Sequence, residues 1–344
     1  MTYSDIIVQN SESHCSVSWW PKFAFHYTDV TNAVSIIDSG TLYSRADATN
    51  LHIMQNDNAS RQVIDMTNPD VVSLVRFYFR PLTPTQYYNE GYKHPSIRYD
   101  RDPNANTPVP IFFLFDLDKL LASPEVKFSE KTQAGHGTAL MSGMDNFSHL
   151  NFDAIYSSGL ENIAETKAYR HAEIVHSGSM EISPCLNTIL CRNSVEQITL
   201  LNLLKQKNNL TYLKYRDRIK VYKKDIFENN GLFVSECLYH DNNISVSFSD
   251  SFAQRTYMRK MMEAYGIENL SPINAKIEIE WFNSRSIIAH TEIKSRIDYA
   301  QPKPINITNV PSYPRAVWVG IKVYFDEKLM CYVTQSLESG EVIK

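Results

Sequence analysis

The sequence predicts an α+β protein with two domains. At 344 residues the chain is too long for one small core. Up to about residue 205, short apolar strands alternate with helical patterns, whereas strands dominate from about residue 210, including 316–325 and 329–336 as a hairpin. Gln, Lys and Asn interrupt the pattern at 205–210. We therefore expect domains at 1–208 and 209–344, the second also α+β.

Composition indicates a folded protein of the cytoplasm. Apolar residues make up 43% and charged residues 21% of the chain, which is ordinary for a globular protein. No apolar run approaches the roughly 20 residues of a membrane span, and the N-terminus lacks the basic start and apolar stretch of a signal peptide. The five cysteines are odd in number, scattered and without a CxxC pair. We therefore expect no membrane segment, no disulfide framework and no metal.

Charge is distributed unevenly along the chain. Residues 1–205 carry 15 Lys and Arg against 22 Asp and Glu, and residues 206–344 carry 19 against 16. The second half is therefore the better candidate for contact with phosphate. A predicted amphipathic helix at 253–265 places Arg255 and Arg259 four residues apart on one face, next to Lys260. The alternative is an ordinary solvated helix face.

The first domain opens with a strand followed by a helix. Residues 23–28 form a short strand pattern, Asp29 or Thr28 can cap the helix, and Gly40 stands where a helix ends. His26 then lies near a strand-to-helix junction, where backbone groups are free to bind a ligand. A histidine that only satisfies local hydrogen bonds is the alternative.

The next elements are predicted from apolar runs and turn residues. We expect a loop at 43–58, a turn of helix at 60–64, strands at 71–79 and 111–116, a short helix at 117–122, a flexible segment at 129–150, strands at 152–156, 172–175 and 189–191, and a helix at 194–204. In the second domain we expect strands at 219–227, 232–239, 244–248 and 275–281.

The stretch Lys-Ala-Tyr-Arg-His-Ala-Glu-Ile-Val-His at 167–176 is the most informative for chemistry. Glu173 follows basic and aromatic residues and precedes the β-branched pair Ile174 and Val175. We expect Glu173 near the start of a strand, exposed in a cleft, with a polar loop leading in from Ser157. A carboxylate on a strand beside a loop is a common catalytic arrangement. A surface or structural ion pair is the alternative.

Three patches together resemble one family. His26-Tyr27-Thr28 with the following helix and Gly40, the aromatic strand and proline turn from Phe77 to Pro84, and Arg-x-Ala-Glu at 170–173 are similar, in order and spacing, to the DarT family of nucleic-acid ADP-ribosyltransferases. The resemblance covers residues 22–205. It implies an ADP-ribosyltransferase-like split β-sheet core with flanking helices. Residues after 210 match no family that we can name.

The resemblance also implies the donor substrate and its contacts. NAD+ is the donor, Glu173 and Arg61 are the catalytic residues, and no metal is needed. The residues expected to contact NAD+ are His26, Tyr27, Thr28, Ser35, Tyr43, Arg61 and Tyr78. Cleavage of the nicotinamide–ribose bond develops positive charge on the ribose, which a carboxylate can stabilise.

The resemblance implies a base of single-stranded nucleic acid as the acceptor, with DNA favoured over RNA. It further implies a toxin of a toxin–antitoxin or anti-phage system, with an antitoxin protein as partner. We expect the flexible 129–172 region to be the substrate loop. Aromatic and basic residues for stacking on a strand are Tyr87, Tyr88, Tyr92, Lys93, Arg98 and Arg101; an ordinary exposed loop is the alternative.

Two other functions remain open from the sequence. One is the same transfer chemistry directed at RNA or at a protein side chain. The other is a non-catalytic binding module with a degenerate site, because each patch is short.

Overall fold

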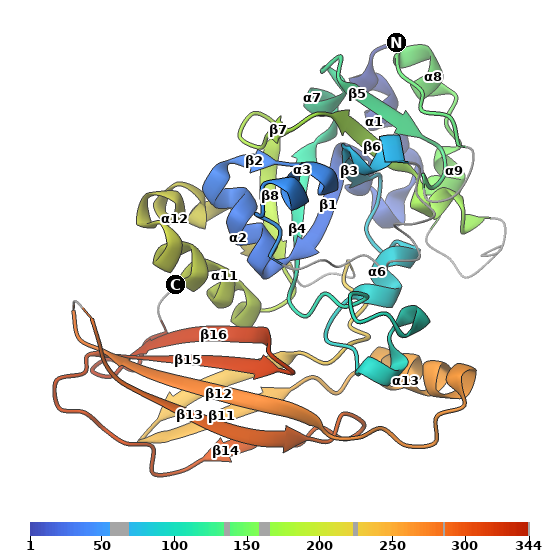
Figure 1. The fold of residues 1–344 in the computed structure, drawn as a ribbon. Helices are drawn as coiled ribbons and strands as arrows, with labels where there is room; N and C mark the ends of the chain where they lie inside the picture. Colours follow the sequence, from blue (N-terminus) through green and yellow to red (C-terminus); the bar gives the residue numbers. More distant parts are fainter. Residues whose placement is uncertain (56–68, 134–137, 158–165, 223–225, 285, 343–344) are drawn as a thin grey trace. The chain divides into compact units, whose positions relative to one another are not determined.

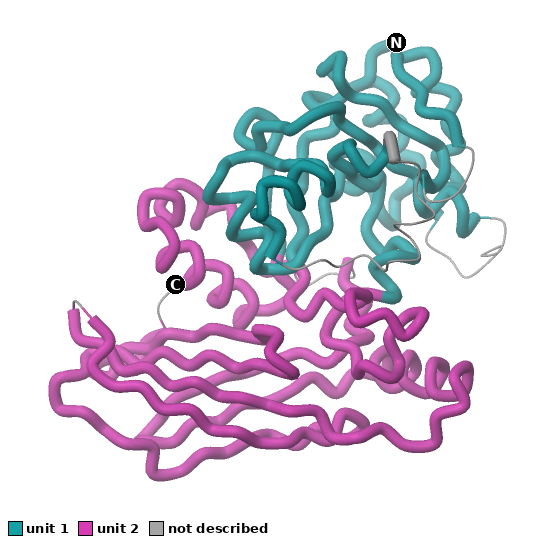
Figure 2. Tube along the Cα trace, viewed as in Figure 1, with its two compact units in different colours: residues 1–88, 111–190 teal, residues 89–110, 191–344 magenta. Residues whose placement is uncertain are grey.

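The chain forms two compact units that interleave along the sequence. The computed structural model describes residues 1–344 apart from 56–68, 134–137, 158–165, 223–225, 285 and 343–344. Unit 1 comprises residues 1–88 and 111–190, and unit 2 comprises residues 89–110 and 191–344 (Figure 2). Residues 89–110 therefore belong with the C-terminal part of the chain. The expected domain division at 208/209 stays a prediction.

A central sheet organises unit 1 (Figure 1). The strands that unit 1 contributes to it run in the order β5-β6-β3-β1-β4-β8. Their bounds are β1 (Phe23–Asp29), β3 (Leu74–Tyr78), β4 (Pro110–Asp116), β5 (Val126–Ser129), β6 (Glu173–Ser177) and β8 (Leu186–Cys191). β3 pairs antiparallel with β1 and with β6, and β5 pairs antiparallel with β6. A separate pair joins β2 (Thr41–Leu42) to β7 (Met180–Glu181).

Aromatic residues fill the core around these strands. Ile111 to Phe115 of β4 are all buried, which explains the uninterrupted apolar run at this point of the sequence. The ring of Phe77 lies 5.2 Å from that of Phe115, and Phe25 lies 6.2 Å from Phe112. The strands that carry the candidate site are thus anchored by large buried side chains.

Helices of unit 1 include several that the sequence patterns did not predict. The helices are α1 (Tyr3–Ser13), α2 (Val30–Ser39), α3 (Arg45–Asn50), α5 (Pro69–Val72), α6 (Pro84–Asn89), α7 (Leu117–Leu121), α8 (Met144–Ser148) and α9 (Phe152–Ile155), with 3-10 turns at Cys15–Val17, Trp20–Lys22 and Tyr169–His171. α3 replaces part of the predicted loop, α8 lies in the segment predicted to be flexible, and α9 replaces the predicted strand at 152–156.

Local capping explains two of these differences, α3 and α9. Asn151 accepts a hydrogen bond from the backbone N–H of Ala154 and starts α9, although the α9 sequence is aromatic and β-branched. Ser44 caps α3 in the same way. Thr2 and Asp5 form a reciprocal capping box at α1. The predicted helical turn at 60–64 lies outside the described residues.

In its described residues, unit 2 contains two antiparallel sheets and three helices (Figure 1). One sheet has the order β10-β11-β14, and the other has the order β13-β12-β15-β16. The strands are β9 (Ile219–Val221), β10 (Val234–His240), β11 (Asn243–Phe248), β12 (Ile273–Phe282), β13 (Ile287–Ile297), β14 (Ile305–Ile307), β15 (Trp318–Phe325) and β16 (Lys328–Ser336). The helices are α11 (Ser194–Lys207), α12 (Asn209–Tyr215) and α13 (Phe252–Tyr265), with 3-10 turns at Pro95–Ile97, Tyr99–Arg101 and Arg216–Arg218.

Two of these strands were not predicted. β13 is mostly exposed to solvent. From Ile288 to Arg296 its residues alternate between exposed and half-buried positions. β14 is only three residues long. The hairpin of β15 and β16 is confirmed, and its turn residues Asp326 and Glu327 both have positive φ, as a tight two-residue hairpin turn requires. Mixed helices and sheets with a strand-rich C-terminal part confirm the predicted α+β class.

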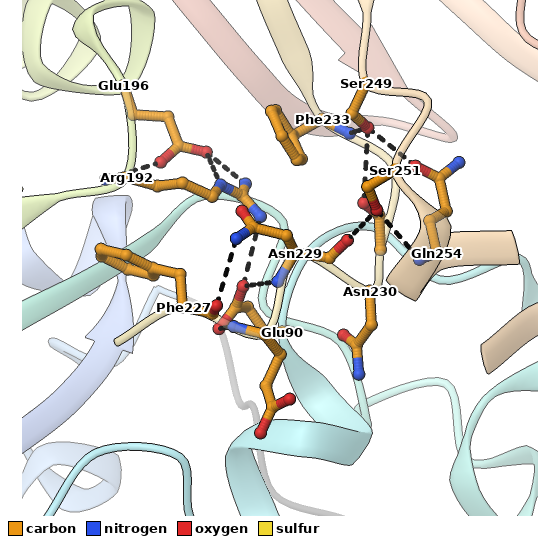
Figure 3. Close-up of polar contacts among 12 residues, drawn as sticks. Glu90, Arg192, Glu196, Phe227, Asn229, Asn230, Phe233, Ser249, Ser251 and Gln254 are labelled. Carbon is orange, nitrogen blue, oxygen red and sulfur yellow. Dashed lines mark hydrogen bonds and ion pairs between the residues drawn. The ribbon is translucent and has the colours of Figure 1, made fainter. Parts of the chain in front are cut away.

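A buried polar cluster organises the middle of unit 2 (Figure 3). The Glu90 carboxylate accepts hydrogen bonds from the backbone N–H groups of Glu228 and Asn229, each at 2.8 Å. Arg192 is 3.5 Å from Glu90 and also forms an ion pair with Glu196. Burial raises the pKa of Glu196 to about 7, an effect that Arg192 opposes. These contacts tie residues 89–110 into unit 2.

This cluster corrects one sequence prediction. Tyr92, Lys93 and Arg98 were expected in an exposed stacking loop, but all three are buried. The ammonium group of Lys93 donates to the backbone carbonyl of Asn230 at 2.7 Å and lies 3.7 Å from the ring centre of Tyr257. Side chains used in this way cannot stack on a nucleic acid strand. The error arose because a basic and aromatic composition is typical of both buried clusters and strand-binding surfaces.

Candidate active site

Three neighbouring strands of unit 1 carry the candidate site. Phe25 of β1 pairs with Tyr78 of β3, and Tyr78 pairs with Glu173 of β6. Residues directly opposite each other in a sheet place their side chains on the same face. Arg76 is two residues from Tyr78 and therefore shares that face. The register thus brings Arg76, Tyr78 and Glu173 together, and Glu173 begins a strand as predicted.

Arg76 and Glu173 form a two-point ion pair. Nε of Arg76 donates to Oε2 of Glu173 at 2.7 Å, and Nη2 donates to Oε1 at 2.7 Å. The Glu173 side chain is 1% exposed and that of Arg76 is 30% exposed. A guanidinium and a carboxylate that meet in this parallel geometry are held in fixed relative orientation. The expectation that Glu173 is exposed is therefore wrong.

A short segment after β5 covers the same carboxylate. The backbone N–H of Gln133 donates to Oε1 of Glu173 at 3.1 Å, and the hydroxyl of Thr132 donates to it at 3.4 Å. Both belong to the region that the sequence predicted as a substrate loop. Residues 134–137 and 158–165 of that region lie outside the described residues.

His26 is linked to Glu173 through the backbone of Arg76. Its Nδ1–H donates to the carbonyl oxygen of Arg76 at 3.0 Å. Its ring lies 6.0 Å from the ring of Phe77 and 6.1 Å from that of Phe113. Burial lowers the pKa of His26, an effect that the Arg76 carbonyl opposes. Imidazole is thus neutral near pH 7, and its hydrogen bond fixes which nitrogen carries the proton.

Electrostatics around the ion pair favour the charged form of Arg76. Burial by itself lowers the pKa of Arg76, but Glu173 and Tyr78 outweigh it, and the pKa is raised. Burial also raises the pKa of Tyr78, while Arg76 opposes this rise. Tyr78 is therefore a neutral phenol beside a charged pair, suited to donate a hydrogen bond or to present its ring to a ligand.

The other predicted contacts belong to β1, to α2 and to the segment before α3. The ring of Tyr27 lies 5.1 Å from that of Phe112, and Thr28 is buried beside the start of α2. Ser35 donates to the carbonyl of Thr31 within α2 at 3.4 Å. Tyr43 is half-buried and precedes α3. Arg61 lies outside the described residues, so its assignment stays a prediction, as do the roles of the other four.

The remaining charged residues near Glu173 have separate contacts. Nε of Arg170 donates to the hydroxyl of Ser157 at 3.2 Å. Burial lowers the pKa of His171 to about 4; Glu173 opposes this shift, and Lys167 and Arg76 add to it. Neither residue is shown to bond to the Glu173 carboxylate. The partner of Glu173 is instead Arg76, which sequence reasoning missed. A signal for it exists, because Arg76 interrupts an otherwise apolar strand between Val75 and Phe77.

This arrangement is suited to transfer of a glycosyl group. A fixed carboxylate can stabilise positive charge on a ribose or accept a proton from an attacking group. In the described parts of the chain, no group of three His, Cys, Asp or Glu residues is placed to hold a metal ion. No helix in these parts is long and apolar enough to cross a membrane.

Comparison with known proteins identifies the family of this chain. The family described as "ssDNA thymidine ADP-ribosyltransferase, DarT" matches residues 25–223, which is more than half of the chain. The protein is therefore an ADP-ribosyltransferase, as the sequence predicted. The chain belongs to the DarT family.

Solved structures of this family match the chain at low identity. The structure of Thermus sp. 2.9 DarT in complex with NAD+ has 16% identity and a TM-score of 0.46, covering 60% of this chain and 98% of that one. Its complex with ADP-ribosylated ssDNA has 16% identity and a TM-score of 0.49, covering 60% and 96%. Thermosipho africanus DarTG in complex with ADP-ribose has 13% identity and a TM-score of 0.46, covering 68% and 57%. No curated protein matches the sequence.

Proposed function

We propose that the protein transfers ADP-ribose from NAD+ to a thymine base in single-stranded DNA, with Glu173 as the catalytic carboxylate. Family membership supports the reaction class and the acceptor. The observation that carries the residue assignment is the position of Glu173, which begins β6 and is held by Arg76 on the neighbouring strand.

The chemistry assigns a role to this carboxylate. As the bond between ribose C1′ and nicotinamide breaks, nicotinamide leaves with the bonding electrons and positive charge develops on the ribose. Glu173 stabilises that charge and then accepts the proton of the attacking base nitrogen. The base nitrogen forms the new bond to C1′. Tyr78, His26, Tyr27, Thr28, Ser35, Tyr43 and Arg61 remain the proposed NAD+ contacts, and Arg61 a second catalytic candidate.

A single strand is the expected form of the acceptor. Glu173 is enclosed by the sheet and by Thr132 and Gln133. A paired base must first leave its duplex to reach such a site, at a cost of a few kcal/mol. Each ~1.4 kcal/mol lowers the rate about tenfold. An unpaired base avoids this cost.

The test is a panel of acceptors with NAD+ labelled in the adenylate phosphate. One sequence is offered as single-stranded DNA, as its annealed duplex and as RNA, each at matched salt, beside a pool of proteins. We expect label on single-stranded DNA and at least about tenfold less on the duplex. Equal labelling of strand and duplex would contradict the proposal. So would label confined to RNA or to protein, the two other acceptors that the sequence left open.

We infer further that the protein acts as a toxin restrained by an antitoxin protein, in a toxin–antitoxin or anti-phage system. The support is family resemblance together with a reaction that modifies DNA. Induced expression of the wild-type protein is expected to arrest growth of a bacterial host, whereas Glu173→Gln is not. Equal arrest by both proteins would contradict this role.

A second DNA contact is proposed on α13 of unit 2. Arg255 and Arg259 lie four residues apart, and both are exposed with Lys260. Arg255 also forms an ion pair with Asp250, so Arg259 is the cleaner test residue. Arg259→Gln is expected to weaken binding of a labelled single strand and to reduce its dependence on salt. Unchanged binding would leave α13 as an ordinary solvated helix.

A further inference from the structure

We propose that Arg76 is a positioning residue of this transferase, which holds the Glu173 carboxylate in the orientation needed for ADP-ribose transfer. The proposal rests on the assigned role of Glu173 and names the group on which that role depends. Arg76 acts through Glu173 rather than on the reacting atoms.

The first argument is the pattern of hydrogen bonds on the two carboxylate oxygens. Oε1 accepts from Nη2 of Arg76, from the N–H of Gln133 and from the hydroxyl of Thr132. In the described parts of the chain, the hydrogen bond to Oε2 comes from Nε of Arg76. Each carboxylate oxygen has two lone pairs, and Oε1 shares its two among three donors, of which the Thr132 hydroxyl is the most distant at 3.4 Å. Oε2 therefore keeps a lone pair that can accept a further hydrogen bond, and Arg76 determines the direction of that lone pair.

The second argument is the rigidity of the strand that carries Arg76. Arg76 pairs with Val175 across β3 and β6, and its carbonyl oxygen accepts a hydrogen bond from His26 on β1. The guanidinium is thus attached to a backbone that is fixed on both sides. Its planar fork matches a carboxylate at two points, which a lysine ammonium group cannot do.

The third argument is the difference in exposure between the partners. Glu173 is enclosed, whereas the Arg76 side chain is 30% exposed. The guanidinium is therefore the more accessible member of the pair. Its two bonds fix the orientation of a carboxylate that Thr132 and Gln133 also contact.

The experiment measures hydrolysis of NAD+ by the full-length protein, which requires no nucleic-acid acceptor. Arg76→Lys keeps the charge but loses the two-point geometry. We expect its kcat to fall roughly 10- to 100-fold, because a misplaced catalytic group loses rate on this scale, with KM for NAD+ within about threefold of wild type. The kcat of Arg76→Ala should be lower still. Addition of guanidinium ion at a non-denaturing concentration should restore part of it.

A matched control separates positioning from folding. Arg80 is also buried in unit 1, but it donates to the backbone carbonyls of Pro81 and Ile155, each at 3.0 Å, and to that of Ser157 at 2.5 Å. Arg80→Lys is expected to lower the melting temperature while kcat per folded molecule stays at the wild-type value. The proposal would be overturned if folded Arg76→Lys kept the wild-type kcat. It would also be overturned if the loss of kcat in Arg76→Lys followed only from its lower melting temperature.

A double-mutant cycle decides the contact without reference to activity. Arg76→Lys, Glu173→Gln and the double variant are compared by chemical unfolding. Coupling between the two changes is expected, since both alter one ion pair. Additive effects on stability would overturn the proposal even if the wild-type protein modified no DNA. Failure to label DNA, with hydrolysis of NAD+ intact, would instead count against the proposed acceptor alone.

Discussion

At the residue scale, His171 makes the stability of the protein depend on pH. This residue precedes Glu173 of the candidate active site by two positions, and burial lowers its pKa to about 4. The unfolded value is about 6.5. The unfolded chain therefore binds a proton more readily than the folded chain between these two values. Stability from the neutral ring is complete above about pH 6.5 and is lost as the pH falls toward 4.

His171→Gln tests this linkage. Glutamine does not titrate, so the variant should lose less stability than the wild type between pH 7 and pH 4.5. Over this pH range the wild type is expected to lose up to about 2 kcal/mol more unfolding free energy than the variant. Partial exposure of the ring makes the difference smaller. Urea unfolding at the two pH values measures it. Identical pH dependence in the two proteins would show that His171 is not held neutral by the fold.

Residue patterns indicated the proposed catalytic carboxylate but not its partner. Glu173 was predicted because a carboxylate precedes β-branched residues in an Arg-x-Ala-Glu stretch, a local signal. Arg76 lies 97 positions away in the sequence, and only the pairing of β3 with β6 brings it to Glu173. The prediction for Tyr92 and Lys93 was wrong because a basic and aromatic composition does not distinguish a buried cluster from a strand-binding loop.

At the element scale, α11 protects the edge of a sheet. β16 is an edge strand, and its backbone groups at Tyr332 bond to the helix instead of to another strand. The N–H of Tyr332 donates to the hydroxyl of Thr199 at 2.9 Å, and its carbonyl accepts from Asn202 at 3.0 Å. Side chains of the helix thus cover groups that otherwise promote pairing between molecules.

Thr199→Val tests this edge contact. Valine has nearly the same shape but leaves the buried N–H of Tyr332 without its partner. The expected loss is about 1–3 kcal/mol of unfolding free energy. Thr188→Val, at a half-buried threonine of β8, is the control and should change stability by less than about 0.5 kcal/mol. Equal effects in the two variants would mean that the Thr199 bond contributes nothing specific.

Elements with strong periodicity or long apolar runs were predictable, and short or polar ones were not. β4 and α13 follow directly from their patterns. α3 and α9 depend on single capping residues, Ser44 and Asn151, and β13 gains its strand conformation from pairing with β12 along its length. The caps of α3 and α9 are local, but a periodicity pattern does not register a single residue. β13 is stabilised by a partner strand, so no local pattern identifies it.

At the scale of the whole molecule, the interleaving of the two units limits where the chain can be cut. α11 precedes the predicted boundary at 208/209, yet it packs against β16 near the C-terminus. Residues 89–110 likewise depend on later residues, since Lys93 bonds to Asn230. A fragment of residues 1–208 therefore leaves buried surfaces of both segments without their partners.

We accordingly expect the 1–208 fragment to lack a cooperative unfolding transition. The measurement is thermal unfolding followed by circular dichroism, with the full-length protein as reference. A sharp transition at the full-length melting temperature would instead support a first domain that ends at residue 208. That result would also show that α11 folds without β16.

The central claim is that Glu173 directs ADP-ribose to a thymine in single-stranded DNA. Its most direct test is mass spectrometry of oligonucleotides that contain one thymine or none, after incubation with NAD+ and either wild-type protein or Glu173→Gln. Wild-type protein should add one ADP-ribose to the oligonucleotide with a thymine and none to the other, and Glu173→Gln should add none at matched folded concentration. Modification of the thymine-free strand, or wild-type modification by Glu173→Gln, would contradict the claim.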